Sequence, residues 1–126
     1  MTVRSHPIDD ITTVERPWGR FEQFVTNARA TVKVITVEPR QRLSLQRHHE
    51  RDELWQLIDG RMEVEVDGCH TTLEVGGRLW VARGSTHRMG NPGDAPARML
   101  EVAFGEFRED DIERLEDDYQ RAVAPQ

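Results

Sequence analysis

The chain has a single cysteine and no long apolar run, and each shortage excludes a class of protein. Because Cys69 is alone, no internal disulfide can form, and its setting in DGCH indicates an incidental reduced thiol. No segment approaches the roughly 18 apolar residues of a membrane span, so we expect no membrane partner. The N-terminal MTVRSHPIDDI lacks the apolar core of a secretory signal, which favours a cytoplasmic location.

Basic residues are fewer than acidic ones, 17 against 23. The formal net charge is −6, the acidic residues gather in EFREDDIERLEDD, and Lys33 is the only lysine. This balance offers no broad basic surface for a phosphate backbone, so nucleic acid is a poor candidate partner. Three arginines, Arg42, Arg47 and Arg51, nevertheless fall close together and would suit a small anion if they converge.

Short strand-like segments dominate the 126 residues and predict one all-β domain. Asp59-Gly60 and Asp67-Gly68 mark tight turns, which predicts a meander in the middle of the chain. A small sandwich or barrel is expected, with a jelly roll as the favoured closure. Only the end has helical spacing, at Ile112, Leu115 and Tyr119. The strand segments are FEQFVT, TVKVITV, RLSLQ, ELWQLI, RMEVEV, HTTLEV, RLWVA and ARMLEVAF.

The stretch SLQRHHERDELW concentrates potential metal ligands. On a strand, Gln46 and His48 share one face while His49 takes the other, and a turn would bring Glu53 beside His48. His87, after a glycine turn far along the chain, would be a fourth ligand. From spacing alone a solvated charged loop explains the stretch slightly better, because glutamine is an uncommon ligand.

Two motifs favour the metal site over the solvated loop. Gln46-x-His48, Glu53 and Gly60 resemble the first cupin motif, and Gly76 with the stretch from Ala82 to Asn91 resembles the second. More narrowly, the chain resembles the type II phosphomannose isomerase domain, which commonly forms the C-terminal part of bifunctional mannose-1-phosphate guanylyltransferase/mannose-6-phosphate isomerase enzymes. The matching stretches are RPWG, QRLSLQ, HH with Arg51 and Glu53, GSTHRMGNPG and EDDIERLEDDY.

The resemblance implies a cupin double-stranded β-helix with one divalent metal. Its ligands would be Gln46, His48, Glu53 and His87. The mixed nitrogen and oxygen donors suit zinc, with manganese, iron, cobalt or nickel as alternatives. The implied reaction is the interconversion of mannose 6-phosphate and fructose 6-phosphate by a standalone isomerase.

Moving a carbonyl between two carbons needs a held negative charge and a proton carrier. Arg51, two residues before Glu53, is the first candidate for a catalytic role, as a charged donor rather than a base. The base is left open between metal-bound hydroxide, His49 and Lys33. The expected contacts to a sugar phosphate are Lys33, Arg42, Ser44 and Arg88, although each cation would equally suit a barrel rim or a surface ion pair.

Departures from the family pattern leave an alternative function. Polar or cationic family positions are Leu54, Ala103, Thr31 and Val34 here, so a cupin that binds a sugar or other small ligand without turnover is the alternative. An oxygenase is less favoured, because such sites usually use more histidines. A homodimer is expected through Ile11, Val14 and Trp18, within an arm of residues 1–20. The barrel would span residues 21–105 and a helical tail residues 106–126.

Overall fold

The computed structural model describes residues 11–121, and within them the chain forms eleven strands and no helix. The strands are β1 (Thr12–Arg16), β2 (Gly19–Gln23), β3 (Ala30–Val37), β4 (Leu45–Arg47), β5 (Arg51–Asp59), β6 (Met62–Val66), β7 (Cys69–Leu73), β8 (Arg78–Val81), β9 (His87–Gly90), β10 (Ala97–Gly105) and β11 (Glu113–Glu116). A two-stranded sheet contains β1 and β2, and two larger antiparallel sheets have the orders β3-β10-β5-β8 and β11-β4-β9-β6-β7.

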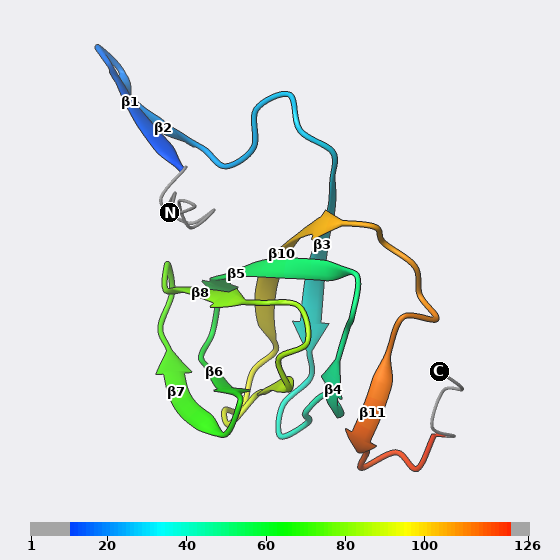
Figure 1. Ribbon diagram of the computed structural model, residues 1–126. Coiled ribbons are helices and arrows are strands. Elements are labelled where there is room, and N and C mark those ends of the chain that lie inside the picture. Colours follow the sequence, from blue (N-terminus) through cyan, green and yellow to red (C-terminus); the bar gives the residue numbers. More distant parts are fainter. Residues whose placement is uncertain (1–10, 122–126) are drawn as a thin grey trace.

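The core is built from residues of the two larger sheets, whose strands are drawn in Figure 1. Trp55 and Met99 come from the four-stranded sheet, Val64 and Met89 from the five-stranded sheet, and all four are at most 2% exposed. The side chains alternate along β6, where Met62 and Val64 are buried while Glu63 is exposed. This two-sheet arrangement confirms the all-β prediction.

The two expected turns have different outcomes. Asp67 and Gly68 join β6 to β7 with φ angles of 49° and 82°, as a tight hairpin requires. The meander is wrong at Gly60, because β5 and β6 lie in different sheets and do not pair. Gly60 carries the chain from one sheet to the other with φ of 81°, and a Cβ there would lie 2.9 Å from Cβ of Ala97.

The hairpin of β1 and β2 projects away from the two sheets (Figure 1). Its Trp18 is 75% exposed, while Arg78 of β8 lies 5.2 Å from the ring centre of Phe24, just after the hairpin. An isolated two-stranded hairpin is marginally stable in water. The division into arm, barrel and tail and the homodimer through Ile11, Val14 and Trp18 stay predictions, and residues 1–10 of the arm lie outside the described range.

The expected C-terminal helix is wrong. Residues Glu113–Glu116 form β11, which pairs with β4 and completes the edge of the five-stranded sheet. Leu115 and Tyr119, which would have faced the core from a helix, are 44% and 49% exposed. Pairing with an open strand edge therefore outweighs the local helical pattern. Within residues 11–121 no helix could cross a membrane.

Candidate metal centre

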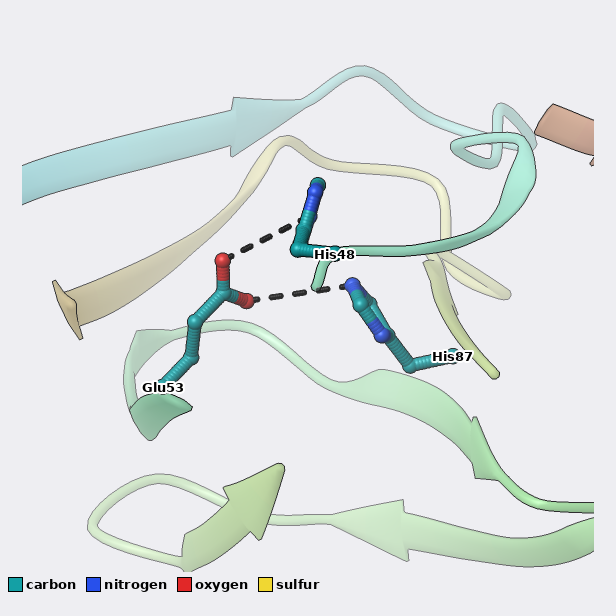
Figure 2. A group of neighbouring side chains, drawn as sticks. All are labelled: His48, Glu53 and His87. Atoms are coloured by element: carbon teal, nitrogen blue, oxygen red, sulfur yellow. Dashed lines mark ion pairs between the residues drawn. The ribbon is translucent and has the colours of Figure 1, made fainter. Parts of the chain in front are cut away.

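Three buried side chains converge between the sheets (Figure 2). His48 directly follows β4, Glu53 lies on β5 and His87 begins β9. Their potential ligand atoms lie within 4.8 Å of one another. Nε2 of His48 is 3.6 Å from Oε2 of Glu53, and Nε2 of His87 is 3.8 Å from Oε1 of the same carboxylate. Residues 39 positions apart in sequence thus form one cluster of donors.

Backbone carbonyls orient both imidazole rings. Nδ1 of His48 lies 2.6 Å from the carbonyl oxygen of Asp111, and Nδ1 of His87 lies 3.0 Å from that of Ser85. A carbonyl can only accept, so each Nδ1 carries the proton and each Nε2 keeps its lone pair. Both lone pairs then belong to the atoms nearest Glu53, which is the tautomer that a metal ligand requires.

The ionisation of the cluster also suits a cation. Burial lowers the pKa of His48 to about 4 and lowers that of His87, so both rings are neutral at pH 7. Burial alone would raise the pKa of Glu53, but the charge of the two imidazoles when they are protonated, together with hydrogen bonds from Glu101 and Arg51, brings it below its usual value. Two neutral imidazoles and one carboxylate are a donor set that fits zinc and other first-row divalent metals.

Gln46, the expected fourth ligand, lies in register with His87 on the neighbouring strand. Both residues line a cavity of about 130 Å³ beside the cluster. Nε2 of Gln46 lies 3.4 Å from the carbonyl oxygen of Ser44. Its amide oxygen as a metal ligand stays a prediction, whereas His49 is 53% exposed and lies 3.6 Å from Glu113, on the opposite side of the strand.

Arg51 lies directly against the cluster and is only 6% exposed. Its Nε donates to Oε2 of Glu53 at 3.1 Å, and its Nη2 lies 3.1 Å from Nε2 of His48. Nη1 donates to the carbonyl oxygen of Arg108, and the guanidinium stacks 4.2 Å from the ring centre of Phe107. A fixed positive charge therefore stands at the cluster, and its catalytic role stays a prediction.

Sequence reasoning missed Glu101, which is 6% exposed on β10 and lines the same cavity. Burial, followed by the negative charge of Glu53, raises its pKa to about 8. The side chain therefore holds a proton at pH 7. Glu101 lies between the buried Met99 and Ala103 in an alternating strand, and this position in the sequence could have indicated that its side chain faces inward.

The segment before β11 fastens the turn that carries His48. The carboxylate of Asp111 accepts hydrogen bonds from the backbone amides of His49 and Glu50, both at 2.9 Å. The carbonyl of Asp111 meanwhile holds the ring of His48. These two amides belong to residues about sixty positions earlier in the chain.

Of the four expected sugar-phosphate contacts, Lys33 and Arg88 line the cavity beside the cluster, whereas Arg42 and Ser44 do not. Lys33 lines the cavity, 3.3 Å from Glu109. Arg88 is 7% exposed, donates to the carbonyl oxygen of Leu43 and pairs with Glu116 at 3.2 Å.

Arg42 and Ser44 do not lie where strict strand alternation would put them. Leu43 and Gln46 both line the cavity although three positions separate them, so the alternation breaks at Ser44 and Leu45. Arg42 pairs with Asp118 at 2.6 Å beside a different hollow, and Ser44 is fully buried with no partner for Oγ. Substrate contact stays a prediction for all four residues.

Comparison with known proteins identifies relatives over nearly the whole chain. A family model described as "Mannose-6-phosphate isomerase C-terminal" matches residues 5–117. The chain is 42% identical over 113 residues to alginate biosynthesis protein AlgA of Pseudomonas aeruginosa, covering 89% of this chain and 24% of that protein. It is 38% identical to mannose-1-phosphate guanylyltransferase of Escherichia coli, with coverage of 86% and 23%. The chain thus spans about a quarter of the length of these relatives.

Solved structures of low sequence identity share the fold. A cupin protein from Bacteroides fragilis matches with a TM-score of 0.56 at 18% identity, covering 60% of this chain and 65% of that one. The capsular polysaccharide assembling protein CapF from Staphylococcus aureus matches with a TM-score of 0.61 at 20% identity, covering 84% and 34%. The predicted cupin fold is therefore confirmed.

The expectation of a standalone isomerase that interconverts mannose 6-phosphate and fructose 6-phosphate is wrong as a description of this chain. Its relatives are named for guanylyl transfer to mannose 1-phosphate and for alginate biosynthesis, and Xanthan biosynthesis protein XanB of Xanthomonas campestris, 41% identical, extends the pattern. XanB is covered over 23% of its length by 86% of this chain. A match to so small a part of each relative does not assign one reaction to the chain.

Proposed function

The chain belongs to the mannose-6-phosphate isomerase C-terminal family, and on that premise we propose that it is a divalent-metal-binding domain that holds a phosphorylated sugar. The observation that carries the proposal is the buried cluster of His48, Glu53 and His87, whose potential ligand atoms lie within 4.8 Å of one another. Zinc is the first candidate metal, and Gln46 would complete the ligand set through its amide oxygen.

The surrounding residues suit chemistry at an oxygen of the sugar. A divalent ion at the cluster would act as a Lewis acid toward a carbonyl or hydroxyl oxygen. Arg51 supplies a positive charge held in place by Glu53 and Phe107, so it can stabilise negative charge without reorganising. In the metal-free protein, Glu101 holds a proton at its carboxyl group within the same cavity. The domain thus has a charge stabiliser and a proton carrier, as members of an enzyme family would use.

The names of the relatives support the class of ligand. One relative is named as a mannose-1-phosphate guanylyltransferase, and the family itself is named for mannose 6-phosphate, so both names support a phosphorylated sugar. Two further relatives are named for the biosynthesis of alginate and xanthan. The cavity, lined by both cations and carboxyl groups, is compatible with a small polar ligand. A cytoplasmic location is part of the same proposal, since these relatives are named as biosynthetic proteins.

Metal content of matched variants tests the proposal. We expect about one zinc, manganese or cobalt ion per chain after dialysis, measured by mass spectrometry, and loss of that ion in His87→Ala. His49→Ala is the control, because this neighbouring imidazole lies 3.6 Å from Glu113 on the other side of the strand. Equal loss in the two variants, or no ion in the wild type with any of these metals, would contradict the proposed centre.

A further inference from the structure

Arg114 stands out among the cations of the cavity because it has no ionic partner within the described residues. Its Nε is buried and makes no hydrogen bond. An unpaired buried donor costs about 1–3 kcal/mol, so such an atom in a cavity indicates a missing acceptor. The other cations of the lining already hold carboxylates: Lys33 with Glu109, Arg51 with Glu53 and Arg88 with Glu116. Nη2 of Arg88 is also buried without a hydrogen bond, but the guanidinium of Arg88 already binds Glu116 and the carbonyl oxygen of Leu43.

The strand register places Arg114 on the same wall as the metal cluster. Arg114 of β11 pairs with Gln46 of β4, and Gln46 pairs in turn with His87 of β9. All three residues line the cavity. Neighbouring strands are about 4.8 Å apart, so the Cα atoms of Arg114 and His87 are separated by roughly 10 Å. A ligand with an oxygen at the metal and an anionic group several ångströms away would reach both.

We propose that Arg114 is the anion-binding residue of this cavity and binds the phosphate group of the sugar whose other end lies at the metal. The inference rests on the proposed function for the identity of the ligand. A guanidinium presents parallel N–H donors that match two phosphate oxygens, and a buried Nε can take one of them.

The acidic neighbours of Arg114 are paired elsewhere and leave its guanidinium free to bind the ligand. The adjacent Glu113 points to the other face of β11, where it pairs with Arg47 at 2.8 Å. The carboxyl group of Glu101 interacts with Glu53, Lys33 and Arg51. No ion pair among residues 11–121 therefore competes with a phosphate for Arg114.

Calorimetric titration with mannose 6-phosphate, mannose and inorganic phosphate tests this role of Arg114, in metal-loaded and in metal-free protein. We expect Arg114→Ala to weaken binding of mannose 6-phosphate by about tenfold to a hundredfold, the effect of losing a charged hydrogen bond, with unchanged metal content. Arg98→Ala is the control, because it removes the same charge from an exposed pair with Asp59. It should bind like the wild type.

Arg114→Lys tests whether weaker binding in Arg114→Ala comes from a folding defect. It keeps the charge but lacks Nε, so we expect binding several times weaker than in the wild type, with a melting curve that confirms the folded state. Binding of mannose 6-phosphate within twofold of the wild type in both Arg114 variants, or equal wild-type affinity for mannose and mannose 6-phosphate, would overturn the proposal. A wild-type protein that binds phosphate through Arg114 but takes up no metal would instead refute the proposed metal-binding function.

Discussion

Replacing Asp111 with alanine should weaken metal binding, although Asp111 is not a ligand. Its carboxylate holds the amides of His49 and Glu50 at 2.9 Å, and its carbonyl holds Nδ1 of His48 at 2.6 Å. The carbonyl survives in Asp111→Ala, so any effect must come from the position of the segment. Partners that orient a ligating histidine typically contribute a factor of about 10 to 100 in metal affinity, and we expect a loss in that range.

The same variant should lose stability in the metal-free state. Each hydrogen bond to a charged group contributes about 1.5–3 kcal/mol, so losing two should lower the free energy of unfolding by roughly 3 kcal/mol or more. Metal affinity is measured by competition with a chelator and stability by urea unfolding. Asp110→Ala is the matched control, because the side chain of Asp110 is 85% exposed and comes no closer to Arg108 than 3.9 Å. Wild-type metal affinity in Asp111→Ala would refute the reasoning.

Lowering the pH should weaken the contact between the carboxylate of Asp111 and the two amides. Burial alone would raise the pKa of Asp111, but the amides of His49 and Glu50 lower it below its usual value. The stability that its ionised form contributes is therefore complete above the unfolded pKa of about 3.9 and is lost as pH falls through the lower folded value. Asp111→Ala should show a smaller loss of stability than the wild type across that acid range.

Two further predictions concern the cavity. Arg51→Ala should raise metal affinity by roughly tenfold. The donors of Arg51 compete for lone pairs of Glu53 and His48, and its positive charge repels a cation. Isothermal titration that showed weaker metal binding in the variant would contradict this. Glu101 keeps its proton in the folded state up to about pH 8, whereas the unfolded chain releases it near about 4.3, so stability of the metal-free protein should fall as pH rises between these values. In Glu101→Gln that fall should be smaller in urea unfolding at about pH 5 and about pH 8, and an unchanged fall would disprove the assignment.

The sequence predicted features that depend on short-range pattern. Alternation along Met62 to Val66 and the Asp67-Gly68 pair predicted a strand and its hairpin, and the structure has both. His48 and Glu53 lie within one short stretch, so a motif could indicate that they meet. The all-β fold followed from many such local signals.

Features that depend on distant pairing were not predictable in this way. The spacing of Ile112 and Leu115 suits a helix, and only the open edge of β4 turns that segment into a strand. Strict alternation along the strand from Gln46 would turn Arg42 toward the cavity, but the chain is irregular at Ser44 and Leu45. The role of Asp111 depends on amides 61 and 62 residues away, which no local pattern shows.

The docking of the last strand has a kinetic consequence. His48 is oriented by a carbonyl 63 residues later in the chain, so the final arrangement of the ring requires closure of a long loop. Contacts between distant residues form slowly, because the chain loses entropy before they stabilise it. The ability to bind metal tightly should therefore be gained late in refolding, when the segment around Asp111 reaches the turn at His49.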